Sequence, residues 1–229
     1  MAKLRKKDII LALIIGELSA LMMVFVGGNL SEENQAFVIV MPYAKYLLFV
    51  FPVLCAAGLF FAYLLSRIIR HFVFQLGKFC LVGGFNFLLD AAVLNFFIFT
   101  TGIAVGLTQS GFKGASFVVG VISSYLWNKH WTFKPPKTNN IKKEFARFLM
   151  VSGIGFVLNI SIDYVLVNMI SPFWNMPPRT WAQFSAVLAA AISLNWNFTG
   201  CKLFVFNNKK CEIKNVQNSV VSQISAAEL

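Results

Sequence analysis

Charged residues are scarce in this sequence. Charged residues make up 13% of its 229 residues, about half of the roughly 25% that a soluble domain carries. Hydrophobic residues make up 58%, and the mean hydropathy is +0.70. This composition excludes an ordinary soluble domain and predicts a polytopic membrane protein.

The residue types that build metal, redox and nucleotide sites are also scarce. The chain has four cysteines and two histidines, and it contains no C-x-x-C pair, so neither a zinc centre nor a disulfide framework is expected. It contains no G-x-x-x-x-G-K-[ST] phosphate loop and no apparent nucleophile triad. We therefore expect no cofactor, no metal and no enzymatic activity.

Long apolar runs are abundant instead. A bilayer core of about 30 Å takes about 20 apolar residues of helix. The first run is a poor signal peptide because it is long and carries Glu17. The fold class that we predict is all-α, with six transmembrane helices at residues 9–28, 46–67, 79–99, 114–131, 148–170 and 181–201.

The basic residues are unevenly placed along the chain. They gather at the N-terminus, after the second and fourth runs, and in the C-terminal tail, whereas the opposite side has Lys45, Lys113 and Arg179. By the positive-inside rule both termini are cytoplasmic. The net charge of +11 is dispersed over short flanks, which argues against nucleic-acid binding.

The last four runs carry an internal repeat. A shift of 73 residues, the separation of Asn86 and Asn159, also places Asp90 on Asp163 and Lys129 on Lys202. We interpret this as a pseudo-repeat of two helix hairpins with the same orientation. Three parts follow: an accessory transmembrane hairpin at 1–70, a four-helix transmembrane domain at 71–208, and a polar cytoplasmic tail at 209–229.

Amides and carboxylates at these repeated positions are candidates for function. Asn86 and Asp90 share one helical stripe, and Asn159 and Asp163 share another. The alternative is structural, because polar side chains hydrogen-bond between membrane helices. A charge at mid-bilayer costs at least ~2.5–3.5 kcal/mol, so intramembrane acids usually face a partner or a polar cavity. We predict a polar groove between the third and fifth spans.

Cations mark the predicted cytoplasmic ends of the same four spans. Lys129 and Lys202 close the fourth and sixth, and Lys78 and Arg147 begin the third and fifth. Snorkelling to water is the plain explanation. Four cations around one end of a bundle would also suit a lipid phosphate, and we predict that these four bind phosphate.

Four stretches together resemble the GtrA-like family. They are KFCLVGGFNFLLD at 78–90, SYLWNKHWTF at 124–133, RFLMVSGIGFVLN at 147–159 and NFTGCKLFVF at 197–206. The resemblance covers about 130 residues and none of the first 70. This chain has Cys201-Lys202 where the family more often has Asn or Ser before Arg, which keeps the charge but loses bidentate phosphate geometry.

The resemblance implies a small bacterial membrane protein that flips a polyprenyl-phosphate-linked sugar across the cytoplasmic membrane for modification of surface glycans. A glycosyltransferase partner and a homo-oligomer are left open. Including Asp163 from the repeat, the substrate-binding residues are expected to be Asn86, Asp90, Asn128, Lys129, Trp131, Arg147, Asn159, Asp163, Asn197 and Lys202.

Two other functions compete with this one. A proton-coupled exporter of small cations would use Glu17 or Asp90 as its switching carboxylate, and its efflux would not depend on the inner cations. A non-transporting scaffold would dock a glycosyltransferase, and its buried acids would tolerate substitution.

Overall fold

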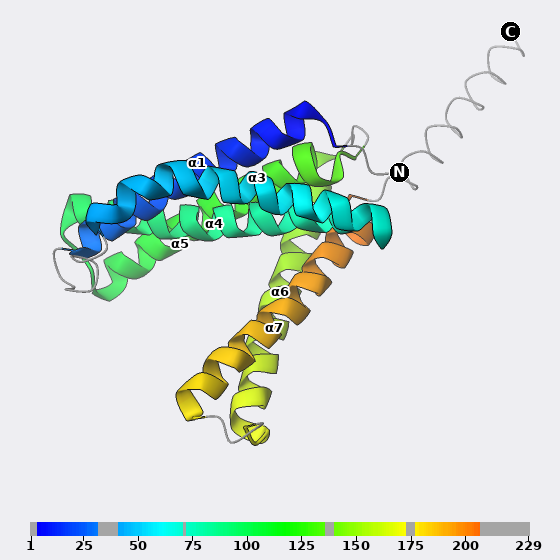
Figure 1. Ribbon diagram of the computed structural model, residues 1–229. Helices are drawn as coiled ribbons and strands as arrows, with labels where there is room; N and C mark the ends of the chain where they lie inside the picture. The colour runs from blue at the N-terminus through cyan, green and yellow to red at the C-terminus, as the bar shows by residue number, and fades with distance from the viewer. Residues whose placement is uncertain (1–3, 32–40, 71, 136–139, 173–176, 207–229) are drawn as a thin grey trace, which may run out of the picture. The chain divides into compact units, whose positions relative to one another are not determined.

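Long helices make up nearly all of the structure that a computed structural model describes, which covers residues 4–31, 41–70, 72–135, 140–172 and 177–206. Each predicted run corresponds to one of six long helices in this described part of the chain (Figure 1). Their bounds are α1 Lys6–Ser31, α3 Ala44–Ile68, α4 Phe72–Thr101, α5 Gly106–Trp127, α6 Ile141–Met169 and α7 Pro178–Gly200.

Local sequence explains where these helices stop and start. Gly102, which follows α4, and Gly106, the first residue of α5, take positive φ angles of 71° and 79°, a conformation that glycine adopts at no steric cost. Lys134 (φ 48°) stands before Pro135, so the helical path ends at Phe133. Asn140 caps α6, because its side-chain oxygen accepts from the backbone N–H of Lys143.

Four of the helices are long and apolar enough to cross a membrane. They are α1, α3 with the short 3₁₀ turn η1 (Met41–Tyr43) before it, α4, and α6. Helices α5 and α7 are not among them in the described part of the chain. A membrane protein is therefore supported, while six spans with cytoplasmic termini stay a prediction.

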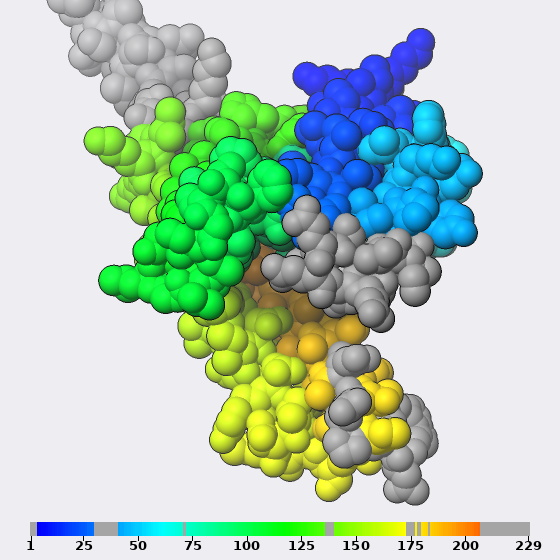
Figure 2. Space-filling view, turned by 90° about the vertical axis from the view of Figure 1, so that its left-hand side faces the viewer, coloured from blue at the N-terminus to red at the C-terminus, as the bar shows by residue number. Residues whose placement is uncertain are grey.

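The first compact unit is Met1–Thr132. In it α1 packs on α3 and α4, α3 packs on α4, and α4 pairs with α5 (Figure 1). Figure 2 shows α1 (blue) and α3 (light blue) side by side. The buried core joins α1, α3, α4 and the residues after α5: Ala12, Ile15, Leu59, Phe74, Val82, Phe85 and Trp131. The segment 1–70 therefore contributes residues to the same core as the next two helices, and its role as an accessory hairpin stays a prediction.

Two glycines let the helices of this unit approach closely. A Cβ at Gly16 would lie 2.5 Å from the Cα of Pro52 in α3, and a Cβ at Gly77 would lie 2.6 Å from the Cβ of Ala62. Near the far end of α1, Asn29 donates to Asn95 of α4 at 2.5 Å. Helix α1 is therefore held along most of its length.

The second compact unit, Phe133–Leu229, is a hairpin of α6 and α7. Trp181 Nε1 donates to the carbonyl of Leu166 at 3.1 Å, and Trp196 Nε1 donates to the carbonyl of Val151 at 3.1 Å. A Cβ at Gly200 would lie 2.5 Å from Val151 Cγ1. These contacts establish which face of α7 is turned toward α6.

Candidate functional site

Both family-like hairpins end in a π-helical turn. Helix α5 continues into η2 (Asn128–Phe133), and α7 continues into η4 (Cys201–Val205). The two turns begin 73 residues apart, the same offset that relates Asn86 to Asn159. Single π-helical turns are rare and frequently occur at functional sites.

Each turn places a lysine over an aromatic ring. Lys129 Nζ lies 5.3 Å from the ring centroid of Tyr125, and Lys202 Nζ lies 5.6 Å from that of Phe198. Lys129 also donates to the Tyr125 hydroxyl at 3.0 Å. The repeat therefore extends from residue identity to side-chain geometry, because the aromatic partner stands four residues before the lysine in both hairpins.

The remaining predicted residues near these turns differ in exposure. Arg147 is exposed on α6. Asn128 is buried, and its amide donates to the carbonyl of Ser124 at 2.9 Å. The side-chain oxygens of Asn128 and Asn197 are both buried and have no hydrogen-bond partner within the described structure, so each amide keeps one acceptor unused.

Lys78 belongs to a buried cluster that the sequence analysis missed. Its Nζ donates to Asp8 Oδ1 at 2.5 Å, and Trp131 Nε1 donates to the same oxygen at 3.1 Å. The backbone N–H of Arg5 donates to Asp8 Oδ2 at 3.1 Å. Lys78 also lies 4.4 Å from the ring centroid of Phe74. Asp8 and Trp131 are each 1% exposed.

This cluster bears on two assignments, which stay predictions. Lys78 was expected to hold a phosphate, but its charge is buried and is compensated by Asp8. Trp131 was expected to touch the substrate, but its ring is enclosed and its N–H is used. The sequence concealed the pairing because Asp8 stands among the lysines of the N-terminus, which looked topogenic.

Asp90 is engaged within its own hairpin. Lys113 of α5 donates to Asp90 Oδ2, and the hydroxyl of Ser116 donates to Oδ1 at 2.6 Å. Both oxygens of Asp90 thus have partners inside the hairpin, and its assignment to the substrate stays a prediction. Asp90 stands 11 residues before the last residue of α4, and Lys113 stands 7 residues after the first residue of α5. In an antiparallel hairpin this spacing brings the long lysine side chain within reach of the carboxylate.

The other predicted polar residues keep acceptor atoms available. Asn86 donates to the carbonyl of Val82 at 2.6 Å, but its side-chain oxygen is buried and lacks a partner among the described residues. Asp163 Oδ1 is also buried and lacks a partner among the described residues. Asn159 and Asp163 are half-buried on α6. The predicted groove joins helices of different compact units, and it stays a prediction.

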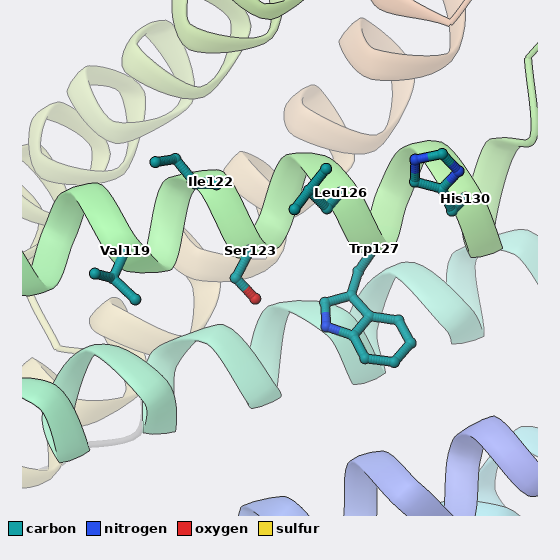
Figure 3. Close-up of a pocket in the computed structure, with 6 residues that line it drawn as sticks. All are labelled: Val119, Ile122, Ser123, Leu126, Trp127 and His130. Carbon is teal, nitrogen blue, oxygen red and sulfur yellow. The ribbon is translucent and has the colours of Figure 1, made fainter.

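An apolar groove runs along one side of α5. It has a volume of about 530 Å³ and is lined by Val119, Ile122, Ser123, Leu126, Trp127 and His130 (Figure 3). Trp127 packs edge-on against Phe85 of α4, with ring centroids 6.0 Å apart. The groove reaches the π-helical turn at His130, the residue after Lys129.

Comparison with known proteins identifies the second part of the chain. A family model described as "GtrA/DPMS, transmembrane domain" matches residues 78–206. The chain is 31% identical over 144 residues to the uncharacterized membrane protein YngA of Bacillus subtilis (strain 168), an alignment that covers 62% of this chain and 84% of that protein. No solved structure matches.

Proposed function

We propose, because this chain belongs to the GtrA/DPMS transmembrane-domain family, that it flips a polyprenyl-phosphate-linked monosaccharide across the bacterial cytoplasmic membrane. It would act as a transporter for surface-glycan synthesis and not as an enzyme. The observation that carries the proposal is the pair of lysines, Lys129 and Lys202, held in the same geometry at the ends of both hairpins.

A phosphate contact is assigned to each hairpin end by itself. Lys129 and Lys202 each follow a helix of their own hairpin, and Arg147 is exposed near the start of α6. A hydrogen bond between a cation and a phosphate is roughly twice as strong as a neutral one. The aromatic ring beneath each lysine limits the positions that the ammonium takes, which lowers the entropy lost when the phosphate binds.

The sugar needs hydrogen-bond partners while it crosses. An unpaired hydroxyl in an apolar medium costs roughly 2–7 kcal/mol. Acceptor oxygens of Asn86, Asp163 and Asn197 are buried without a partner among the described residues, so they are suited to compensate this cost. The chain's part in the mechanism is therefore to replace water around the hydroxyls during passage.

The isoprenoid tail is assigned to the groove on α5. Its lining residues are mostly apolar, and it ends beside Lys129 at His130. A lipid lying there would place its phosphate at the π-helical turn while the tail stays in contact with hydrocarbon. Apolar lining with a charged end is the pattern that a lipid phosphate requires.

The test is uptake of tritiated citronellyl-phosphoryl-glucose into sealed proteoliposomes. We expect Lys129→Gln and Lys202→Gln each to reduce the initial rate by about tenfold, the effect of losing one charge-assisted hydrogen bond. Lys142→Gln is the matched control, because Lys142 is an exposed cation in the first turn of α6, and it should retain the wild-type rate.

A double Lys129→Gln, Lys202→Gln variant that transports at the wild-type rate would show that the phosphate assignment is wrong. Efflux of small cationic drugs that depends on Glu17 would favour the exporter. Wild-type liposomes without uptake, together with a glycosyltransferase that co-purifies, would favour the scaffold.

A further inference from the structure

The two hairpins differ at the height of their repeated carboxylates. In the first hairpin Asp90 is clamped by Lys113 and Ser116, whose side chains occupy both of its oxygens. A Cβ at Gly120 would lie 3.7 Å from the Cβ of Asp90, so α5 passes close to α4 here. Both oxygens of Asp90 therefore have partners within this hairpin.

The second hairpin lacks this clamp. The residues 73 positions after Lys113 and Ser116 are Ala186 and Ala189, which carry no polar side-chain atom. Asp163, the counterpart of Asp90, has a buried Oδ1 without a hydrogen-bond partner in the described part of the chain. The two hairpins therefore differ at this position: both oxygens of Asp90 accept a hydrogen bond, whereas Oδ1 of Asp163 has no partner in the described structure.

Helix α7 of the second hairpin also carries two buried serines whose hydroxyls are unpaired in the described structure. Ser185 and Ser193 are 0% and 5% exposed, and neither hydroxyl has a partner among the residues described. They lie on the stripe of α7 that contains Trp181 and Gly200, both of which contact α6. Buried hydroxyls without partners are uncommon, and each one in a native structure calls for an explanation.

Asn197 continues the polar stripe at the end near η4. A Cβ at Gly155 of α6 would lie 2.1 Å from Asn197 Oδ1, so the glycine leaves the space that the amide fills. Asn197 Oδ1 also has no partner in the described structure. Asp163, Ser185, Ser193 and Asn197 together define what we call the α6–α7 seam.

We propose that the α6–α7 seam receives the hydroxyl groups of a polyol headgroup. A carboxylate and an amide oxygen accept hydrogen bonds, and serine hydroxyls both donate and accept. A sugar carries several hydroxyls of the same dual character, so it satisfies a mixed row of this kind. This inference rests on the proposed function and names the α6–α7 seam as a binding place for its sugar.

Removal of the seam hydroxyls provides the test. Ser185→Ala with Ser193→Ala deletes two hydroxyls that make no hydrogen bond within the described structure, so the melting temperature should stay the same or rise. Ser116→Ala is the matched control, because Ser116 is also a fully buried serine but donates to Asp90. The control should lower the melting temperature and leave ligand recognition unchanged.

Recognition is measured by equilibrium binding of two probes to the purified full-length protein. The probes are citronellyl-phosphoryl-glucose and citronellyl phosphate, which differ in the sugar. We expect the wild type and Ser116→Ala to prefer the glucosylated probe by about tenfold or more, the effect of a few hydrogen bonds. The double serine variant should bind both probes equally.

The inference is overturned if the wild type binds both probes equally, if it binds neither, or if the double serine variant keeps the sugar preference. It is also overturned if that variant loses as much thermal stability as Ser116→Ala, because the hydroxyls would then be structural. A sugar preference that the serines control, without any uptake into proteoliposomes, would support the seam and refute flipping.

Discussion

Replacing Asp8 with Asn should destabilise the first unit strongly. The substitution keeps the size of the side chain but removes the counterion of Lys78, whose side chain is 6% exposed against 1% for Asp8. Removing one partner of a buried pair costs about 3–5 kcal/mol, since the other charge is left uncompensated. The acceptor that serves Trp131 is also altered.

A double-mutant cycle gives the interaction free energy of the Asp8–Lys78 pair. Lys78→Met removes the orphaned charge, so the double variant should recover a large part of what Asp8→Asn loses. Arg5→Gln is the control at the same carboxylate: Arg5 lies 3.6 Å from Asp8 but is 55% exposed. An exposed pair of this kind contributes about 0–1 kcal/mol.

The assay is unfolding of the purified protein in mixed micelles titrated with dodecyl sulfate, followed by tryptophan fluorescence. An Asp8→Asn variant as stable as Arg5→Gln would refute the reasoning. So would a double variant no more stable than Asp8→Asn, because the loss would then come from something other than an unpaired lysine.

Two glycine pairs give further predictions. Gly16→Ala should lower the free energy of unfolding by about 1–3 kcal/mol, because its Cβ meets backbone atoms of α3. A Cβ at Gly58 meets nothing within 4 Å, so Gly58→Ala should raise the free energy of unfolding by up to about 1 kcal/mol through helix propensity. Equal free energies of unfolding for the two variants in a dodecyl sulfate titration would contradict this. Gly155→Ala should displace the Asn197 amide and lower uptake of citronellyl-phosphoryl-glucose severalfold, whereas Gly153→Ala, with open space around it, should keep the wild-type rate.

Local properties of the chain determined the helices and the repeat. Apolar runs, glycines and prolines act within a few residues of themselves, so the six helices and the end of the helical path at Phe133 followed from the sequence. The lysines of the hairpin ends were found in the same way, because Lys129 and Lys202 stand at matching positions of the repeat and close two of the apolar runs.

Tertiary structure alone decided which polar groups are paired. Asp8 and Lys78 are separated by 70 residues, and their contact depends on how α1 is rotated and how far it is shifted along α4. Hydropathy does not determine how a helix is rotated about its axis or shifted along its neighbour, since a uniformly apolar run has no face that distinguishes one orientation from another. For that reason the sequence placed Asp90 and Asp163 as equals, whereas packing bonded both oxygens of the first and left one oxygen of the second without a partner in the described structure.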